Sequence, residues 1–292
     1  MKLCLVEKKY FKQIRDIDYK AFSREEPRKL TSIATLNQSA PEGCFVALEG
    51  RKVVGFIFCK VFGSEGFIGP FGVNPDFQGK GYGKMLLNAS IEYLKTQCSV
   101  IGLEVNPSMT RNICVYNDAG FITAFPTVIF DTSASFTEPL PKDYKIRPIR
   151  KNESPLWLER LDSRLKSEFN GISYFAEIQR ALAYDGRVLA AFENDEPAGF
   201  IAYCPTTSPF AWGAIKGLPE QADVLQDLIN SINSEYGVHV PVAVNGRFIN
   251  AMTLLSSCRF KVKLSMNRML LKGYEGDYFS TSDKLMLKAW MN

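Results

Sequence analysis

The apolar positions in the first part of the chain follow two periods. A period of two, or a short continuous apolar run, is typical of a strand, whereas a period of about 3.6 is typical of a helix that buries one face. Strands are predicted at 3–7, 66–73, 99–105 and 121–130, with a hairpin at 44–62. A first helix is predicted from Phe11 to Ala21, and a short second helix after the polar stretch 23–32. A third helix is predicted to follow the glycines of 79–83 and to run to about Gln97, and a fourth to lie between Pro107 and Gly120.

A segment rich in Ser, Thr and Pro, 131–144, then interrupts the pattern and carries little apolar periodicity. Such a composition indicates a linker. After it the pattern restarts with a strand at 145–150 and a helix that uses Ser154 as its cap and Pro155 as its first residue. We therefore predict a domain of 1–133, a linker of 134–144 and a second domain of 145–292.

The second part of the chain repeats the first. The Gly-Phe-Ile of 55–57 aligns with that of 199–201 at an offset of 144 residues. The segment VNPSMTRNICVYNDAGF, 105–121, aligns without a gap with VNGRFINAMTLLSSCRF, 244–260, at an offset of 139 residues. Two ordered matches in the same element context favour duplication over chance, and the smaller second offset predicts a shorter segment between them in the second copy.

Between these anchors in the first copy lies PDFQGKGYGKMLL, 75–87, where three glycines and two lysines precede an apolar helical pattern. A helix start presents unpaired backbone N–H groups and partial positive charge, and glycines let a phosphate approach the backbone closely. The stretch fails the Walker pattern at Gln78 and Met85, and its Gly-x-Gly-x-Gly spacing fails the dinucleotide fingerprint. It satisfies Gln/Arg-x-x-Gly-x-Gly/Ala at 78–83, although a plain glycine-rich surface turn is an alternative interpretation.

At these residues the sequence resembles the GCN5-related N-acetyltransferase (GNAT) family. FGVNPDFQGKGYGKMLL, 71–87, is similar to the acetyl-CoA loop of that family, and 105–121 is similar to its following strand and helix. The resemblance covers about 1–130 in element order and extends weakly through the repeat. The sequence departs from the family pattern at Met109 and Asn112, where the helix commonly has Asn and then Ala, so some pantetheine contacts are expected to differ.

The resemblance implies an α/β fold of two tandem GNAT-like domains, each a mixed, mostly antiparallel twisted sheet flanked by helices. It also implies an acyltransferase that passes an acetyl group from acetyl-CoA directly to a primary amine, with no covalent enzyme intermediate. The expected cofactor-binding residues are Phe71, Gly72, Val73, Gln78, Gly79, Lys80, Gly81, Tyr82, Gly83 and Lys84. Solvated lysines at a helix start would look the same as the two in this group.

Acetyl transfer needs a neutral amine, aligned reactants, a stabilised oxyanion and a proton for the leaving thiolate. The resemblance implies that Tyr116 supplies this proton, because it stands four residues before Gly120-Phe121 in the family motif. A phenol, with a pKa of about 10, can donate to a thiolate whose thiol has a pKa of about 8.5. A half-buried helix aromatic is the alternative interpretation of this tyrosine.

The base that accepts the amine proton is less determined by the sequence. Glu65, beside the loop-bearing strand, and Glu104, in GLEV, are the candidates, and each is also compatible with a solvated strand carboxylate. Glu25 and Glu26 have the charge to attract a cationic amine, but a charged pair in a polar connection is usually only solvated. His239, the one histidine, is expected to lie on a strand of the second copy and to be structural.

The second copy lacks the chemistry of the first. Leu255 stands at the place of Tyr116 and has no proton to donate, and the counterpart of the glycine-rich turn, within 215–228, keeps a helix start without the glycines. We therefore expect the second copy to bind no acetyl-CoA productively, and to wall the substrate cleft or extend the sheet.

Composition adds several exclusions. A net charge of +4 suits an anionic small ligand and is too small for a nucleic-acid polycation, so no nucleic-acid partner is expected. Seven scattered cysteines without a Cys-x-x-Cys pair indicate reduced thiols in a cytoplasmic protein, and a single histidine argues against a metal site. The first apolar run stops at Val6 and no stretch approaches the length of a membrane span, so no signal peptide and no membrane association are expected.

The sequence leaves the acceptor open among a small amine, an amino acid, an antibiotic and a protein amine, and it allows a monomer or a homodimer. It also leaves two functions without catalysis. One is an acyl-CoA-binding or sensing module that keeps the fold without turnover. The other is a scaffold in which both copies only contact other proteins.

Overall fold

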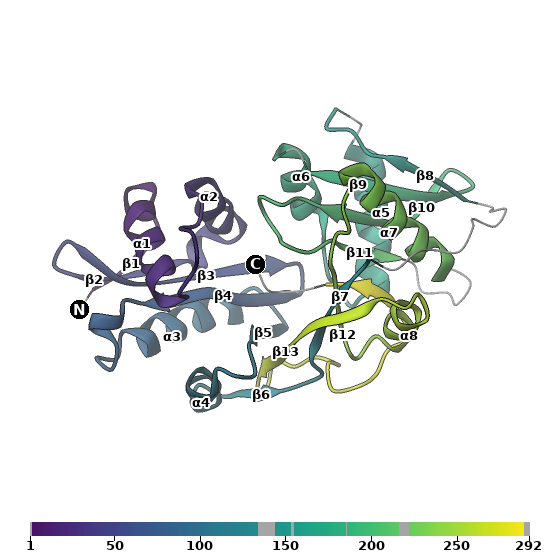
Figure 1. Ribbon diagram of the computed structural model, residues 1–292. Coiled ribbons are helices and arrows are strands. Elements are labelled where there is room, and N and C mark those ends of the chain that lie inside the picture. The colour runs from purple at the N-terminus through teal and green to yellow at the C-terminus, as the bar shows by residue number, and fades with distance from the viewer. Residues whose placement is uncertain (1, 134–143, 153–154, 185, 216–221, 289–292) are drawn as a thin grey trace. The chain divides into compact units, whose positions relative to one another are not determined.

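The computed structural model describes residues 2–133, 144–152, 155–184, 186–215 and 222–288 (Figure 1). These residues fall into two compact units. Unit 1 contains 2–123 and 269–276, and unit 2 contains the described residues of 124–268 and 277–288. All but the last residue of the linker expected at 134–144 lies outside the described residues, so the domain boundaries 1–133 and 145–292 stay a prediction.

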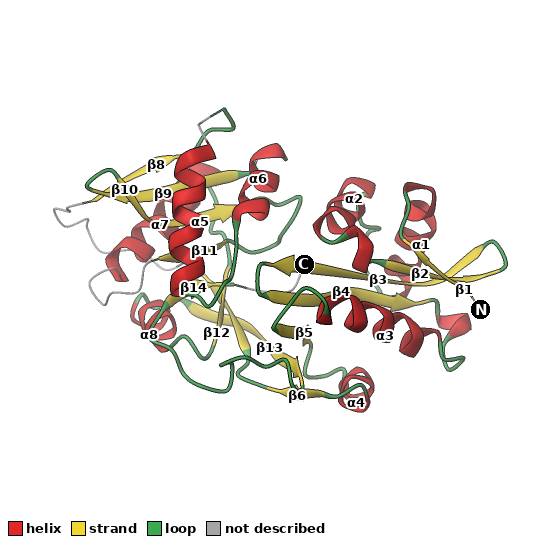
Figure 2. Ribbon diagram, turned by 180° about the vertical axis from the view of Figure 1, so that it is seen from behind, coloured by secondary structure: helices red, strands yellow, loops and turns green. Residues whose placement is uncertain are grey.

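Unit 1 is a mixed sheet with helices on both faces. Its elements are β1 (Lys2–Leu5), α1 (Phe11–Ala21), α2 (Leu30–Ser39), β2 (Phe45–Glu49), β3 (Lys52–Phe62), β4 (Glu65–Val73), α3 (Tyr82–Lys95), β5 (Val100–Val105), α4 (Thr110–Asp118) and β6 (Phe121–Thr123). Strands β1 to β4 pair with their sequence neighbours in antiparallel fashion, and β4 pairs with β5 in parallel. Helices α1 and α2 cover one face and α3 covers the other (Figures 1 and 2).

The central strand β3 explains why this part of the sequence is so apolar. Helices pack on both of its faces, and eight consecutive residues from Val53 to Lys60 are buried. A strand covered on both sides reads as a continuous apolar run and not as an alternation. Helix α3 approaches β3 closely at Gly55, where a Cβ would lie 2.9 Å from Cδ1 of Leu86. The absence of a side chain at Gly55 therefore allows α3 to pack directly on β3.

The prediction of a single strand at 121–130 is wrong, because the structure divides this segment into two strands, β6 and β7 (Thr127–Asp131). Pro126 precedes β7 and has no N–H group to continue a ladder. In unit 1, β6 pairs with Met269–Leu271, the end of strand β13 (Lys261–Leu271). In unit 2, β7 pairs with the beginning of β13. Each unit therefore takes a strand segment from the other half of the sequence.

Unit 2 has the same kinds of elements in the same order. They are β8 (Tyr144–Pro148), α5 (Pro155–Glu168), α6 (Phe175–Ala183), β9 (Arg187–Glu193), β10 (Glu196–Tyr203), β11 (Trp212–Ile215), α7 (Ala222–Tyr236), β12 (Val242–Asn245), α8 (Ile249–Ser257) and β14 (Leu285–Leu287), together with β7 and most of β13. Five of its strands form an antiparallel sheet in the order β14-β11-β10-β9-β8. Strand β7 pairs with both β12 and β13.

The structure confirms the internal repeat. Helices α4 and α8 span nine residues each and begin 139 residues apart, which is the offset of the second sequence match. The first match also falls on equivalent strands, because Gly55 pairs with Val73 in unit 1 and Gly199 pairs with Ile215 in unit 2. The predicted α/β class of two tandem domains, each with a mostly antiparallel sheet flanked by helices, is confirmed.

Candidate active site

Strands β4 and β5 separate part-way along their length. They pair over Glu65–Ile68 and Val100–Leu103, and no described strand continues the pairing beyond that point. Pro70, two residues later, has no N–H group for a ladder bond. The last residues of β4, 71–73, therefore pair with β3 on one side and leave the other edge of their backbone open. An open strand edge offers N–H and C=O groups to a ligand.

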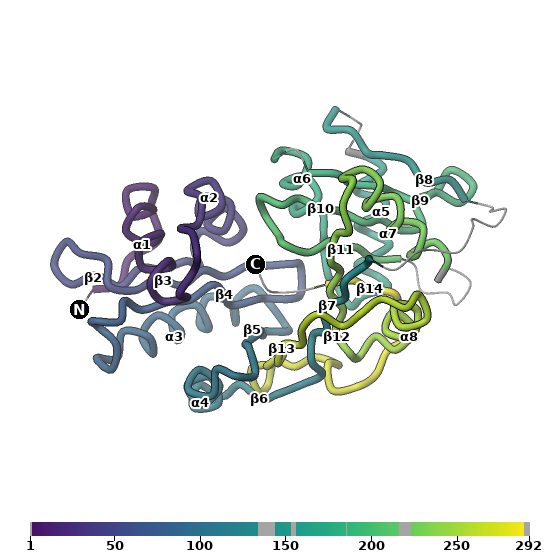
Figure 3. Tube along the Cα trace, viewed as in Figure 1, coloured from purple at the N-terminus to yellow at the C-terminus, as the bar shows by residue number. Residues whose placement is uncertain are grey.

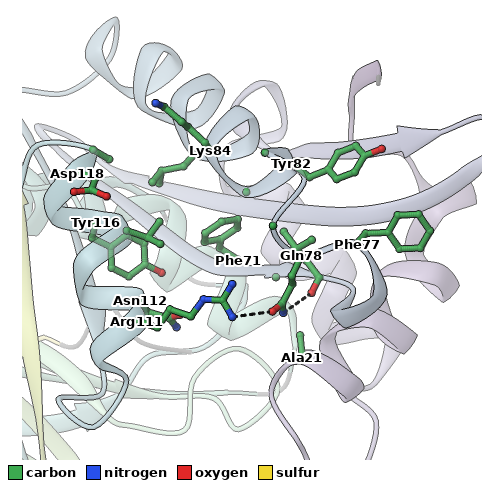
Figure 4. A pocket seen from close by; sticks show the side chains of 18 of the residues that line it. Ala21, Phe71, Phe77, Gln78, Tyr82, Lys84, Arg111, Asn112, Tyr116 and Asp118 are labelled. Atoms are coloured by element: carbon green, nitrogen blue, oxygen red, sulfur yellow. Dashed lines mark hydrogen bonds between the residues drawn. The ribbon is translucent and has the colours of Figure 1, made fainter.

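A pocket of about 640 Å³ lies at this open edge, entirely within unit 1 (Figure 4). Its walls come from the end of α1, the end of β4, the glycine-rich turn, the first turns of α3 and one side of α4. The predicted cofactor-binding residues that line it are Phe71, Gly72, Val73, Gln78, Gly79, Gly81, Tyr82, Gly83 and Lys84. The structure therefore brings together in one pocket all but one of the predicted cofactor-binding residues.

Lys80 is the exception. It is not among the pocket-lining residues, and its Nζ lies 4.9 Å from the centre of the Phe77 ring. A cation held over an aromatic face in this way is a favourable surface contact. Tyr82 lines the pocket, but Figure 4 shows its side chain pointing away, so any contact with a ligand would involve its backbone.

The glycine-rich turn exposes a row of backbone donors. Gly79 and Gly81 have φ angles of 77° and 84°, in the left-handed region, and a Cβ on either would meet nothing within 4 Å. Within the described residues, no backbone N–H group from Gly79 to Lys84 donates a hydrogen bond. These groups lie at the start of α3, where the helix dipole adds partial positive charge. The turn thus fits a diphosphate, with room for the ligand where side chains would otherwise be.

A further glycine brings two walls of the pocket together. A Cβ on Gly83 would lie 3.3 Å from Cζ of Phe71, so this glycine allows α3 to start close to β4. The end of α1 forms another wall, because Ala21 and Phe22 line the pocket. Sequence analysis did not identify these two residues, because they precede the glycine-rich turn by more than fifty positions.

Helix α4 forms the opposite wall and carries Tyr116. Figure 4 shows this side chain reaching from α4 toward Phe71. The ring is half-buried and makes an edge contact with the buried Phe121, with ring centres 6.2 Å apart. Burial raises the pKa of Tyr116 to about 12 by disfavouring the phenolate. The hydroxyl therefore stays protonated near neutral pH and remains a hydrogen-bond donor.

Other residues of α4 and the two residues that flank it also line the pocket, and of these the sequence analysis had noted only Met109 and Asn112, as departures from the family pattern. They are Met109, Arg111, Asn112, Val115, Asp118 and Ala119. Two long hydrogen bonds connect α4 to the glycine-rich turn and to β4: Arg111 donates from Nη1 to Oε1 of Gln78 at 3.4 Å, and Gln78 donates from Nε2 to the carbonyl of Val73 at 3.3 Å (Figure 4). In the sequence, the helical spacing of positions 109, 112 and 116 was the signal that these side chains lie on the same face as Tyr116.

Neither predicted base is among the pocket-lining residues. Glu65 is buried at the beginning of β4, where it pairs with Phe62 and Val100. Phe71 lies six positions further along the strand, or about 20 Å away. Glu104 is half-buried and directly follows Leu103, the last residue of β5 that pairs with β4. The structure thus brings Glu104 to the point where the strands separate and leaves Glu65 at the far end, while the role of each stays a prediction.

The comparison with protein families agrees with this geometry. Residues 11–121, which include every wall of the pocket, match the family described as "Acetyltransferase (GNAT) family". Residues 11–121 therefore match a GNAT domain. This domain coincides with unit 1 apart from its first strand, the end of β6 and the segment 269–276.

Solved structures show that both units share the GNAT fold. A Pyrococcus horikoshii protein provisionally named as an acetyltransferase matches with a TM-score of 0.76 at 15% identity, over 99% of this chain and 94% of that one. A tandem GNAT protein from the clavulanic acid biosynthesis pathway matches with a TM-score of 0.60 at 13% identity, over 93% and 98% of the two chains. A GCN5-related N-acetyltransferase from Sphaerobacter thermophilus also gives 0.60 at 13% identity, over 96% and 98%. No curated protein matches this sequence.

The second GNAT-like unit has no open edge at the equivalent place. Gly213–Ile215 in β11 correspond to Phe71–Val73 in β4, because each set pairs in the same way with the strand before it. In unit 2 these three residues also pair with β14, and each residue of β14 is at most 1% exposed (Figure 3). Strand β14 therefore covers the edge of β11 whose equivalent in the GNAT domain, the edge of β4, is open to the pocket.

The other expected defects of the second copy can be located in part. Leu255, at the place of Tyr116, is fully buried in α8. Of the segment expected to replace the glycine-rich turn, residues 216–221 lie outside the described residues.

His239 is exposed in the loop before β12 and not on a strand as expected. Within the described residues, no group of three or more potential metal ligands is found, and no helix is long and apolar enough to cross a membrane.

Proposed function

We propose that this protein is an acetyl-CoA-dependent N-acetyltransferase that transfers the acetyl group directly to a primary amine. One observation carries the proposal: a row of unbonded backbone N–H groups at the start of α3 and the open edge of β4 line the same pocket as Tyr116. Acyl transfer in general follows from the GNAT domain. The donor, the acceptor and the role of each residue are the proposed part.

In this proposal the glycine-rich turn binds the diphosphate of acetyl-CoA. The open edge of β4 binds the pantetheine arm and donates to the thioester carbonyl, whose oxygen gains negative charge when the amine attacks. The backbones of Phe71 and Val73 provide these contacts. Both reactants are then aligned in one pocket, which supplies much of the rate acceleration by proximity.

Tyr116 donates a proton, or a strong hydrogen bond, to the sulfur of coenzyme A as the C–S bond breaks. The amine loses a proton on the way to the amide, so the two proton transfers balance. Glu104 is the proposed acceptor of the amine proton through water, since it lies where β4 and β5 separate. We further propose a small-molecule or protein amine as the acceptor, no nucleic-acid or membrane partner, and a cytoplasmic monomer or homodimer.

The proposal is tested by measuring free thiol release from acetyl-CoA with a panel of primary amines, together with the mass of each product. We expect thiol release that depends on the amine and a product heavier by one acetyl group. Tight binding of acetyl-CoA without turnover on any amine would support the acyl-CoA-binding or sensing module instead. If CoA does not protect the protein against thermal unfolding, the scaffold interpretation is favoured.

The pH dependence of kcat/KM gives a separate prediction. The nucleophile is the neutral amine, so kcat/KM should rise with pH toward the pKa of the amine. Tyr116 acts in its protonated form, and its pKa of about 12 keeps that form present across the measured range. We therefore expect a rise and then a plateau through about pH 10, where an ordinary tyrosine would already titrate. A falling limb below that pH that is absent in Tyr116→Phe would contradict the prediction.

A further inference from the structure

The end of α1 carries a buried carboxylate bound by two arginines. The Asp18 side chain is 2% exposed, and its Oδ2 accepts from Nε of Arg24 at 2.6 Å and from Nε of Arg28 at 3.5 Å. Arg24 also donates from Nη2 to Oδ1 at 3.3 Å. The group combines one negative and two positive charges, so it retains one excess positive charge within the unit.

This excess charge lacks part of its hydrogen bonding. Nη2 of Arg28 is buried and has no hydrogen-bond partner among the described residues. Burial lowers the pKa of Arg28, the Asp18 carboxylate opposes this effect, and the neighbouring Arg24 guanidinium adds to it. A buried cationic N–H group without a partner is uncommon in native proteins and calls for an explanation, such as a bound ion.

Neither arginine lines the pocket, but Arg24 lies next to a residue that does. The guanidinium carbon of Arg24 is 5.1 Å from the ring centre of Phe22, and Phe22 lines the pocket. This wall belongs to the end of α1 and lies apart from the glycine-rich turn in the sequence. The turn and the open edge of β4 account for the donor, which leaves the α1 side for the acceptor.

We propose that Arg24 and Arg28 bind an anionic oxygen group on the acceptor, so that the preferred substrate is an amine that also carries a carboxylate or a phosphate. This inference rests on the proposed acetyl transfer to a primary amine. Guanidinium groups bind such anions through paired, charge-assisted hydrogen bonds. Asp18 holds both arginines in place before the acceptor arrives and so limits the ordering cost on binding.

Glu25 and Glu26 do not reverse this charge. Both are exposed, so water and salt screen them. Asp18, the buried carboxylate of this region, already accepts hydrogen bonds from both arginines. The pair of glutamates was considered as an attractor for a cationic amine, and the arginine next to Phe22 favours an anion instead.

The test compares acceptors in matched pairs. Amino acids of increasing length are each measured against their primary amides, and an amino-alkyl phosphate is measured against its amino alcohol. For at least one pair we expect kcat/KM to be about 10- to 100-fold higher for the anionic member, as for one hydrogen-bonded charge pair. The carboxylate and phosphate pairs distinguish the two kinds of anion. A preference for the neutral members or for diamines would overturn the inference.

Variants then assign the preference to the arginines. Arg24→Gln leaves Arg28 paired with Asp18 and should reduce the preference, whereas Arg28→Gln should remove it and Arg28→Lys should restore part of it. In all three variants the readout is the ratio of kcat/KM for the anionic acceptor to kcat/KM for its neutral amide, so a general loss of activity does not change the result. Arg15→Gln is the matched control, because this arginine of α1 pairs with the exposed Asp16 and not with Asp18.

The outcomes separate the two proposals. If no amine in the panel releases thiol, the proposed function fails. If amines are acetylated but the anionic members have no advantage, or keep their full advantage in both Arg24→Gln and Arg28→Gln, the inference fails and the proposed function stands. Arg24→Gln keeps the test decisive if Arg28→Gln does not fold.

Discussion

Gly81→Val should abolish the binding of acetyl-CoA. A side chain at this position would project into the open part of the pocket in front of the free N–H groups of the glycine-rich turn. We expect affinity to fall by about 100-fold or more, since hydrogen bonds to a charged group contribute about 1.5–3 kcal/mol each and several would be lost. Isothermal titration and the CoA-induced rise in unfolding temperature measure this loss.

Gly81→Val also strains the backbone, so a matched control is needed. Gly273 has a φ of 86°, nearly the 84° of Gly81, a Cβ there would also meet nothing within 4 Å, and it does not line the pocket. Gly273→Val should therefore lose a similar amount of stability, about 1–2 kcal/mol, and keep full CoA affinity. Wild-type affinity in Gly81→Val, or an equal loss in the control, would show that the turn does not bind the diphosphate.

This prediction concerns the whole chain and not only the GNAT domain. The edge equivalent to the open part of β4 is covered in unit 2 by β14, whose residues are buried. Replacing β14 with a ligand would expose three buried side chains and break its ladder with β11. A single substitution in the GNAT domain should therefore remove all detectable CoA binding, and a wild-type titration should give one site per chain.

Tyr116→Phe should lower kcat by about 100-fold, the lower end of what a positioned acid contributes, while the affinity for acetyl-CoA changes little. The substitution keeps the ring, and with it the edge contact with Phe121, so it removes only the hydroxyl. Steady-state kinetics over a range of amine and acetyl-CoA concentrations separate kcat from KM. Product release must not mask the chemical step, so a single-turnover measurement should give the same ratio.

Tyr93→Phe is the matched control for this experiment. Tyr93 is a half-buried tyrosine of α3 that packs near Gly43 and does not line the pocket. Its hydroxyl should be dispensable for the reaction, so kcat should stay within about twofold of the wild type. An unchanged kcat in Tyr116→Phe near neutral pH would leave this tyrosine as a structural contact of α4 and remove it from the mechanism.

The local sequence determined the parts of the protein that depend on neighbours in the chain. Hydrophobic periodicity located most strands and helices, because burial of one face sets the period within each element. The glycine-rich turn was recognisable because positive φ angles and a helix start both leave short-range signals, and the structure has both at Gly81. The repeat located α8 to the residue, since a gapless offset of 139 carries one helix onto the other.

Tertiary structure decided everything that depends on residues far apart in the chain. Ala21 and Phe22 line the pocket together with the glycine-rich turn, although more than fifty positions separate them from it in the sequence. The pairing of β14 with β11, which closes the second copy, joins segments some seventy residues apart. Such contacts are selected by the packing of whole faces and edges, which leaves no local period in the sequence.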